Sequence, residues 1–470
     1  MHRELLKTKY KKKGGRFPMG ITERYCQATH CYTGETDGFG YAFVPGSSVG
    51  VVLLDLRTKQ LLCDLNSFRF GEDERRVELL LENKLIELPS VSQRPRALDT
   101  RNIKSISIWL HVSNNCNLVC PYCYIIGKDG QYMSRATAKA FLDKLEITVR
   151  VHCLKAVTVR IAGGEPTLHK ELICFLVSEV RRRFADKGIL VKLILITNGT
   201  TLNEKWLHLI SSASMQLCIS LDGVNEWNDR LRFFRNGKGT FDRVMRSIDL
   251  CAQLGIRPHI LTTITDANIR GIPHLNKFLI DAQLPFRYGV FRDSVGNHTG
   301  YQRFSEKAME VLDDCYDYYA RAIRERQIPF AHQFSDIHLD KRTHLRSCSV
   351  GFSGITINHL GQAFFCQMQM DKNSLGTVKD KATLLELVWS QRVLPELQGS
   401  NVLSYEGCRE CHWALVCGGG CPGVNTNACG RATIASPYCD LFRFVIPKLI
   451  ELKALSLINK HKQTVLNGRR

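Results

Sequence analysis

The sequence predicts an α/β fold built on a parallel sheet, with a small α+β domain before it and a Cys-rich segment after it. Three observations lead to this prediction. From residue 103 to about 293, apolar strands alternate with amphipathic helices. Short strands and one helix come before them, and closely spaced cysteines come after residue 345. Six strand–helix units are too few for a closed eight-fold barrel.

The first hundred residues form a separate part of the pattern. A basic leader, MHRELLKTKYKKKGGRF, lacks the apolar core of a signal peptide. Strands are predicted at 40–45, 50–55, 59–64 and 85–88, with a helix at 71–82 and a linker at 89–102. Cys26 and Cys31 have only His30 as a nearby metal-ligating partner, so we interpret them as plain thiols.

The central region supplies the strands and helices of the parallel sheet. The predicted strands are 105–111, 156–162, 191–197, 216–221, 259–265 and 287–291. The predicted helices are 134–150, 170–186, 204–211, 241–254, 269–282 and, beyond the sheet, 304–327. Chemistry in such sheets collects at the carboxyl ends of the strands.

Three cysteines follow the first of these strands. Cys116, Cys120 and Cys123 are separated by three residues and then by two, unlike the distant ligand pairs of a zinc knuckle. No fourth Cys or His follows at cluster spacing, whereas iron–sulfur cubanes usually have four Cys ligands. Three local ligands therefore predict a cubane with one open iron; the alternative is three buried apolar cysteines.

With Tyr122 directly before the third Cys, this motif resembles the signature of radical S-adenosylmethionine (SAM) enzymes. The resemblance implies a [4Fe–4S] cluster that binds SAM through its open iron. Reductive cleavage of SAM would then give a 5′-deoxyadenosyl radical that abstracts hydrogen from a substrate. It also implies a partial (β/α)6 TIM barrel, with an open side for a large substrate.

Further motifs at the predicted strand ends match the same family. Gly163-Gly164-Glu165-Pro166 follows the second strand and resembles the tetrad that meets the amino group of SAM. Asn198 and Ser220 end the third and fourth strands at positions that contact the cofactor in the family. Arg232 is a candidate carboxylate partner, in a motif that has Asn228 where the family has His. No catalytic acid or base stands out.

The C-terminal cysteines resemble the seven-Cys SPASM extension of peptide-modifying radical SAM enzymes. The resemblance assigns an outer auxiliary [4Fe–4S] cluster to Cys408, Cys411, Cys417 and Cys439. It assigns an inner cluster to Cys348, Cys366 and Cys421. No Cys precedes Cys348 to complete the inner set, which leaves an open iron, His344 or an outside group as its fourth ligand, with Cys429 a weaker candidate. A zinc ribbon fits seven ligands at these gaps poorly.

The N-terminal pattern resembles a small winged-helix element that binds leader peptides as an added strand. An insertion of unknown role is the alternative. The expected parts are this element at 1–100, the partial barrel at 101–300, a bridging helix at 301–345, the SPASM domain at 346–445, and a helix with a tail at 446–470.

These resemblances imply a ribosomal-peptide (RiPP) maturase that installs a C–C, C–O or thioether crosslink on a precursor peptide, with cyclophane-forming enzymes as the first choice. Sulfatase-maturating enzymes, which oxidise Cys or Ser to formylglycine, carry Asp where this chain has Gln367. They remain an alternative. A radical SAM RNA-modifying enzyme and a zinc scaffold are the others, although no RNA-binding signature accompanies the cysteines.

Composition limits the class of protein and its location. The chain has 470 residues, of which 44% are hydrophobic and 23% charged, as in globular proteins. No apolar run approaches the length of a membrane helix. Of its 19 cysteines, ten have the spacings of cluster ligands and the other nine are scattered, as expected for reduced thiols. This favours a cytoplasmic location. The net charge of +19 fits acidic partners, such as an acidic peptide or an electron-donating flavodoxin or ferredoxin.

Overall fold

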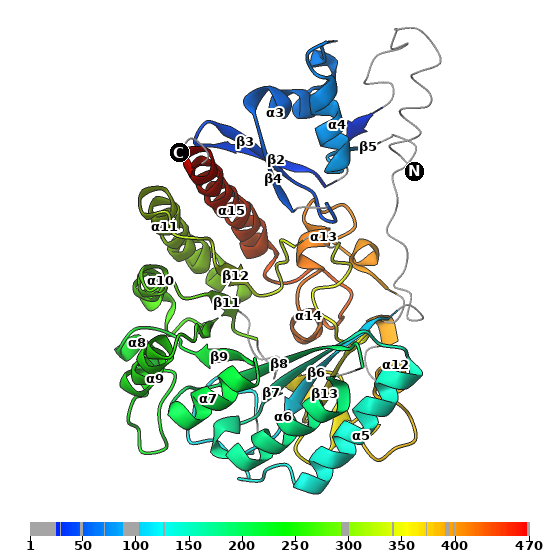
Figure 1. The fold of residues 1–470 in the computed structure, drawn as a ribbon, viewed down its shortest axis with the longest axis vertical. Helices are drawn as coiled ribbons and strands as arrows, with labels where there is room; N and C mark the ends of the chain where they lie inside the picture. The colour runs from blue at the N-terminus through cyan, green and yellow to red at the C-terminus, as the bar shows by residue number, and fades with distance from the viewer. Residues whose placement is uncertain are drawn as a thin grey trace. The chain divides into compact units, whose positions relative to one another are not determined.

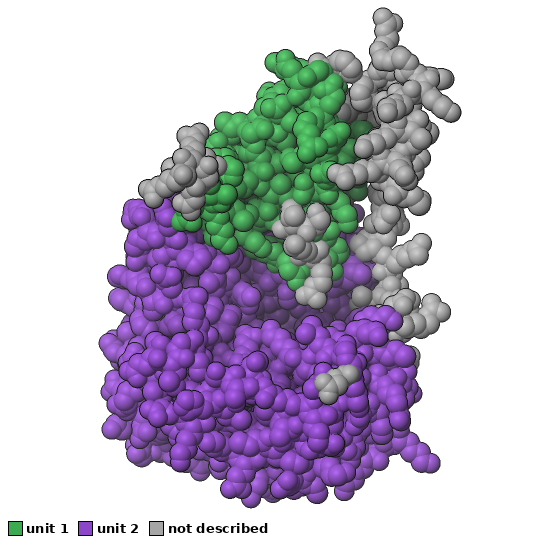
Figure 2. Space-filling model, viewed as in Figure 1, with its two compact units in different colours: residues 1–94, 339–343, 453–470 green, residues 95–338, 344–452 purple. Residues whose placement is uncertain are grey.

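The computed structural model divides the chain into two compact units, which are described separately (Figure 2). Unit 1 comprises residues 1–94, 339–343 and 453–470, and unit 2 comprises residues 95–338 and 344–452. The described residues are 25–467, except for 29, 48–49, 70, 88–102, 126, 186, 293–299, 341–342, 373, 391–394 and 398–399. The basic leader and the expected linker at 89–102 lie outside them.

Unit 2 is organised around a ten-stranded sheet with the order β12-β11-β10-β9-β8-β7-β6-β13-β14-β15. The strands from β6 to β12, together with β13, pair in parallel, and β14 and β15 add antiparallel pairs. The parallel strands are β6 (Ser105–His111), β7 (Ala156–Ala162), β8 (Leu190–Thr197), β9 (Gln216–Ser220), β10 (His259–Ile264), β11 (Phe286–Val290), β12 (His332–Phe334) and β13 (Gly354–Ile357). The antiparallel ones are β14 (Gln362–Phe364) and β15 (Gly376–Thr377).

Helices connect these strands and lie outside the sheet; α5, α6 and α7 lie below it in the view of Figure 1. They are α5 (Arg135–Val151), α6 (Lys170–Phe184), α7 (Glu204–Ser212), α8 (Glu226–Asp229), α9 (Phe241–Gln253), α10 (Ile272–Asp281) and α11 (Tyr301–Arg326). Side-chain caps explain several starts: Ser134 accepts a hydrogen bond from Thr137 N, and Asn203 accepts one from Trp206 N. The predicted strands and helices agree with these bounds to within three residues, and the α/β fold with a partial barrel is confirmed.

The two faces of the sheet differ in chemistry. Alternate residues such as Ile106, Ile108 and Leu110 of β6 are fully buried and apolar, as a face covered by helices requires. The residues between them, including Ser107 and Trp109, are partly accessible and largely polar. Parallel sheets are normally apolar on both faces, so the polar face lines an accessible space rather than a second core.

The Cys-rich segment of unit 2 begins at Cys348, before β13, and contains short helices. They are α12 (Leu384–Trp389), α13 (Ala414–Cys417) and α14 (Pro422–Cys429), and α15 (Cys439–Asn467) begins at a cysteine. In Figure 1, α13 and α14 lie above the strands, on the side away from α5, α6 and α7. The cysteine-bearing loops therefore lie on the polar side of the sheet.

Unit 1 contains a three-stranded antiparallel sheet, β2-β3-β4, the helices α3 and α4, and the part of α15 from Lys453 onward. Its elements are β1 (Cys26–Gln27), β2 (Tyr32–Thr36), β3 (Phe39–Phe43), β4 (Val51–Leu54), α3 (Leu56–Cys63), α4 (Glu74–Glu82) and β5 (Ile86–Glu87), and β1 pairs with β5. The strand predicted at 59–64 is wrong, because this stretch belongs to α3. Asp55 caps that helix through Thr58 N at 2.7 Å, and Thr58, Leu61 and Leu62 are buried at helical spacing.

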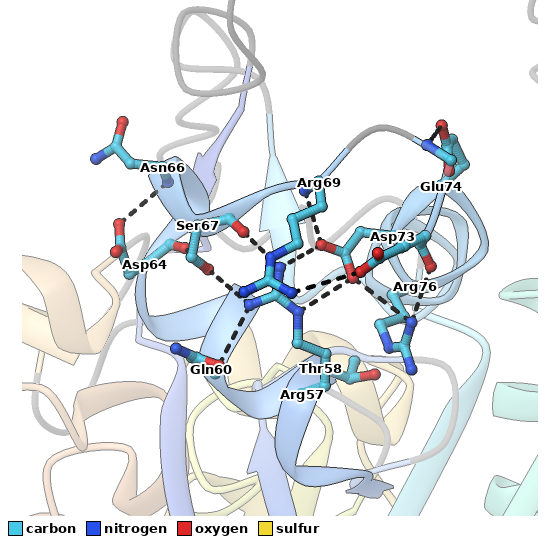
Figure 3. A network of polar contacts seen from close by, with 12 residues as sticks. Arg57, Thr58, Gln60, Asp64, Asn66, Ser67, Arg69, Asp73, Glu74 and Arg76 are labelled. Carbon is cyan, nitrogen blue, oxygen red and sulfur yellow. Dashed lines mark hydrogen bonds and ion pairs between the residues drawn. The ribbon is translucent and has the colours of Figure 1, made fainter.

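A buried carboxylate holds the helices of unit 1 together (Figure 3). Asp73 is fully buried and accepts hydrogen bonds from Arg57 Nε at 3.3 Å and from Arg69 N at 2.8 Å, and it forms an ion pair with Arg57. Arg57 also donates to the Ser67 carbonyl and to Gln60 Oε1, the latter at 3.2 Å. The hydrogen bond from Arg57 holds the pKa of Asp73 below its usual value.

In the part of the chain that the structure describes, no helix is both long enough and apolar enough to cross a membrane.

Candidate active site

The three clustered cysteines lie in the loop that follows β6. Cys116 is buried, and Cys120 and Cys123 are half-buried. Leu118 N donates to Cys116 Sγ at 3.4 Å, and Val119 N donates to the Phe233 carbonyl at 3.0 Å, so the loop is held from both sides. Burial raises the pKa of Cys116 to about 11, and the charges of Glu165 and Cys120 add to the rise. A cationic cluster would reverse this preference by favouring thiolates.

Gly163 and Gly164 bring the loop after β7 directly against the cysteine loop. Gly164 N donates to the Ser113 carbonyl at 2.6 Å, and Glu165 N donates to the Asn115 carbonyl at 2.8 Å. A Cβ on Gly164 would lie 2.2 Å from the Asn115 carbonyl oxygen and 3.0 Å from Cys116 Cβ. Only glycine permits this approach, so the position of Cys116 depends on it.

The Glu165 carboxylate is fully buried and accepts four hydrogen bonds. Oε1 accepts from Thr167 N at 3.0 Å, from Thr167 Oγ1 at 2.5 Å and from Thr197 Oγ1 at 2.6 Å. Oε2 accepts from Asn198 N at 2.7 Å. The carboxylate therefore connects the ends of β7 and β8, and Pro166 begins the 3-10 turn Pro166–Leu168 beside it.

Asn198 connects the end of β8 to the cysteine loop. Its Nδ2 donates to Asn117 Oδ1 at 2.9 Å, and its Oδ1 accepts from Thr200 N at 2.9 Å. Asn117 Nδ2 donates in turn to Thr200 Oγ1 at 2.8 Å. The residue directly after Cys116 is thus positioned by the neighbouring strand.

A second buried network positions Tyr122. The Tyr122 hydroxyl donates to Asp222 Oδ2, and Arg232 Nη1 donates to the Tyr122 oxygen at 2.5 Å and to Asp222 at 3.2 Å. Asp222 Oδ1 also accepts from Thr263 N at 2.8 Å. Arg232 Nε is buried with no hydrogen-bond partner among the described residues. Ser220 ends β9 two residues before Asp222 and pairs with Leu261.

Four C-terminal cysteines influence one another's charge. Burial raises the pKa of Cys408 to about 12, and the charges of Cys439 and Cys411 add to that rise. Cys417 shows the same shift to about 12, with burial first and then the neighbouring thiols Cys439, Cys408 and Cys411. The structure therefore brings together the four residues expected at the outer auxiliary site.

The other three SPASM-type cysteines form a second group beside an arginine. Burial raises the pKa of Cys366 to about 12, with contributions from Cys421 and Cys348. Arg292 Nη1 donates to Cys421 Sγ at 3.5 Å, and its Nη2 binds both oxygens of Asp336 at 2.8 Å. The Asp336 carboxylate raises the pKa of Arg292 above its usual value.

Three consecutive glycines join these two groups. Gly418, Gly419 and Gly420 all have positive φ. A Cβ on Gly418 would lie 2.1 Å from Ser347 N, next to Cys348. This loop therefore brings Cys417 and Cys421 against the segment that carries Cys348.

The remaining candidates lie as follows. The His344 ring stacks on His338, with centroids 4.1 Å apart, and Cys429 is exposed at the end of α14. Cys31 is buried in the apolar cluster of unit 1, and Cys26 Sγ lies 3.6 Å from the Glu87 carbonyl oxygen.

In the described part of the chain, no three His, Cys, Asp or Glu side chains are arranged to hold a single metal ion. A cubane instead takes each thiolate on a different iron.

Comparison with known families identifies the chemistry of the first cysteine group. The family model of the radical SAM superfamily matches residues 110–278. The protein is an enzyme with a radical SAM domain. This match runs from the end of β6 into α10 and includes the three cysteines, Gly163 and Arg232. The family implies SAM and a [4Fe–4S] cluster as cofactors.

Relatives of this radical SAM enzyme cover most of the chain. A cysteine-type anaerobic sulfatase-maturating enzyme of Clostridium novyi is 25% identical over 368 residues, which is 74% of this chain and 96% of the relative. The solved structure of native anSMEcpe with bound AdoMet has a TM-score of 0.62 at 19% identity and covers 74% of this chain and 99% of that one. Streptococcus suis SuiB bound to precursor peptide SuiA has a TM-score of 0.53 at 15% identity, covering 87% and 98%.

Several residues of the radical SAM site were missed at the level of sequence. Asp222 comes two residues after the strand end at Ser220, but Tyr122 lies a hundred positions away, and no local spacing connects the two. Arg292 lies two residues after β11, so its place near a strand end was the available signal. Asp336 follows β12, a short strand that the sequence pattern did not predict.

Proposed function

We propose that this radical SAM enzyme is a peptide maturase that installs a C–C, C–O or thioether crosslink on side chains of a precursor peptide. The observation that carries the proposal is the pair of cysteine groups, four and three, on the polar side of the barrel sheet. Crosslinking removes two hydrogens from a side-chain pair, and two auxiliary [4Fe–4S] clusters would carry the surplus electron to an acceptor. The SuiB relative, whose name states a bound precursor peptide, supports a peptide substrate.

The residues present fit the cofactors that this function needs. Cys116, Cys120 and Cys123 would hold the SAM-binding cluster, which supplies the hydrogen-abstracting 5′-deoxyadenosyl radical when SAM is bound. Arg232 Nε, buried without a partner among the described residues, offers a donor to a carboxylate. The glycine approach at Gly164 would hold the cluster loop against the SAM-binding tetrad.

Unit 1 would recognise the precursor peptide outside the reacting segment. Its sheet has two edge strands, β2 and β4, and an extended peptide can add to such an edge through main-chain hydrogen bonds. The second helix, α3, brings the unit nearer to a winged-helix peptide-recognition element than the sequence pattern suggested. An acidic flavodoxin or ferredoxin would supply the electron to the basic protein.

Formylglycine formation is the second candidate, because the Clostridium novyi relative is named for sulfatase maturation. Gln367, which follows Cys366, argues against it. Its Oε1 lies 3.5 Å from Cys366 Sγ, where the sulfatase-maturating pattern has an Asp. A neutral amide at this position cannot accept the substrate proton that a carboxylate could take.

Anaerobic reconstitution tests the proposal. We expect about twelve irons per chain and reductive cleavage of SAM to 5′-deoxyadenosine. The Cys116→Ala variant should keep about eight irons and lose SAM cleavage, whereas Cys153→Ala, which alters an exposed cysteine outside every group, should lose neither. About four irons in the wild-type chain would contradict the auxiliary clusters.

The product decides between the two candidates. Short peptides encoded beside the gene should lose two hydrogens per crosslink and stay unreactive toward a hydrazide. Formation of a hydrazide-reactive aldehyde would instead establish formylglycine chemistry.

A further inference from the structure

The polar face of the barrel sheet carries a group of basic side chains that the proposed chemistry does not use. In parallel strands, residues paired side by side point to the same face. The register pairs Trp109 with Arg160, Arg160 with Ile194, and Leu261 with Arg287. Arg160 Nη1 donates to Ser107 Oγ on the same face of β6, which fixes its direction.

The same register places the other cations on this face. Cys218 pairs with His259 across β9 and β10, and Lys192 lies two residues before Ile194 on β8. Arg160, Lys192 and Arg287 therefore project from β7, β8 and β11 into the space that the polar face lines. We call these three residues the cation cluster.

Electrostatic contacts show that the members of the cation cluster lie near one another. Burial raises the pKa of Cys218 to about 11, and Arg287, Arg160 and Lys192 each oppose that rise. Burial and the charge of Arg160, among others, lower the pKa of Arg287. Three strands thus direct positive charge at one region.

The cation cluster has no internal counter-ion. Among the described residues, no carboxylate forms an ion pair with Arg160, Lys192 or Arg287. The carboxylate within electrostatic reach of Arg287 is Asp336, and both its oxygens are bound by Arg292. Arg160 is half-buried and Lys192 and Arg287 are exposed, so all three charges are accessible to an incoming anion.

We propose that the substrate of this enzyme is a peptide with an Asp or Glu side chain close to the modified residue, and that the cation cluster binds its carboxylate. The proposal rests on the peptide-maturase function proposed above and names its substrate class. Arg offers a planar pair of donors that matches a carboxylate, and such charge-assisted contacts are stronger than neutral ones. Arg292 binds Cys421 and lies within electrostatic reach of Arg287, so the cation cluster lies beside the inner cysteine group.

Selection from a random library of displayed 12-residue peptides tests the proposal on the anaerobically reconstituted full chain. The wild-type protein should enrich peptides that contain Asp or Glu. Replacing Asp or Glu by Asn or Gln in the most enriched peptide should weaken binding about tenfold, as expected for one charge-assisted contact. The double variant Arg160→Gln/Arg287→Gln should no longer enrich acidic peptides. It should also bind the acidic peptide and its Asn or Gln counterpart equally well.

The matched control is Lys139→Gln/Lys277→Gln. These lysines are 65% and 63% exposed on α5 and α10, so the control changes the net charge equally away from the polar face. It should select acidic peptides as the wild type does. If both double variants lose the preference equally, overall charge is responsible and the proposal is overturned.

A second variant guards against misfolding. Arg160→Lys/Arg287→Lys keeps both charges and should retain most of the acidic preference, with the iron count unchanged. A single-stranded 12-nucleotide RNA that displaces the enriched peptide, and depends on Arg160 and Arg287, would overturn the peptide assignment in favour of nucleic acid. Failure of SAM cleavage with the acidic preference intact would instead refute the proposed function alone.

Discussion

Asp222 is the residue on which the position of Tyr122 depends. It accepts from the Tyr122 hydroxyl, pairs with Arg232 at 3.2 Å and binds Thr263 N at the end of β10. Its side chain is 1% exposed. Removing one partner of a buried pair leaves the other charge uncompensated, which typically costs about 3 kcal/mol or more.

We therefore expect Asp222→Asn to lower the stability of the radical SAM domain by about 3 kcal/mol. It should also weaken SAM binding, since Arg232 would lose its anchor. Thermal unfolding and SAM titration of the reconstituted protein measure the two effects. Asp266→Asn is the control, because its ion pair with Lys307 is exposed and worth below about 1 kcal/mol. Equal effects of the two substitutions would contradict the role assigned to Asp222.

His332 couples stability to pH. Its ring is buried and stacks on Phe286, with centroids 4.5 Å apart, and burial lowers its pKa to about 3. The unfolded chain protonates this group near its ordinary pKa of about 6.5. As the pH falls, the unfolded state therefore takes up a proton before the folded state does. The free energy of unfolding decreases as the pH falls below about 6.5.

Between pH 7.5 and 5.5, this one group should cost about 1.4 kcal/mol of stability. The His332→Phe variant should lose correspondingly less stability on acidification than the wild type, as measured by anaerobic thermal unfolding at both pH values. His274→Phe alters an exposed histidine on α10 and should leave the wild-type acid dependence in place. An unchanged acid dependence in His332→Phe would show that its protonation is not linked to folding.

At the scale of elements, the glycine loop at 418–420 joins the two C-terminal cysteine groups, and we expect their assembly to depend on it. Gly418→Ala would place a methyl group 2.1 Å from Ser347 N at a positive φ of 59°. We expect the variant to lose the auxiliary iron, leaving about four of about twelve irons per chain, and to keep SAM cleavage.

Gly430→Ala is the matched control for this loop. Gly430 also has a positive φ, at 77°, but nothing lies within 4 Å of an added Cβ. Backbone strain alone should cost about 1 kcal/mol and leave the iron count unchanged. Equal iron losses in the two alanine variants would assign the effect to strain rather than to the contact with Ser347.

The elements that sequence could predict are those with strong periodicity. Strands β6 and β7 were predicted with their observed bounds, because apolar residues alternate through a run of seven in each. β12 and β13 were missed, since three or four residues give no reliable period. The prediction of a strand at 59–64 fails because Asp55 caps a helix, α3, and a short apolar run does not by itself distinguish a helix from a strand.

Sequence spacing identifies the candidate ligands that are close along the chain, whereas it does not identify residues that pairing across strands brings together. Cys116, Cys120 and Cys123 form a local motif that needs no register. The direction of Arg287 depends on the pairing of β10 with β11, which sequence spacing does not contain. Buried partnerships such as that of Tyr122 with Asp222 require the folded sheet.

At the scale of the molecule, the two units divide recognition from chemistry if unit 1 binds the precursor peptide. The Asp73 network holds the helices of unit 1, and none of its partners belongs to unit 2. Asp73→Asn should destabilise unit 1 more than the control below, because it removes the charge partner of Arg57 at a fully buried side chain. Glu78→Gln, which breaks only an exposed pair with Arg75, is the control.

We expect Asp73→Asn to leave iron content and SAM cleavage unchanged, because all ten assigned cluster cysteines lie in unit 2. Binding and modification of the full precursor peptide should fall at least about tenfold, since a destabilised recognition unit lowers the fraction competent to bind. Backbone amide hydrogen exchange should become faster in unit 1 and stay unchanged in unit 2. Full modification of the precursor by a chain whose unit 1 exchanges rapidly would show that recognition resides in the barrel, where the cation cluster would then have to supply it.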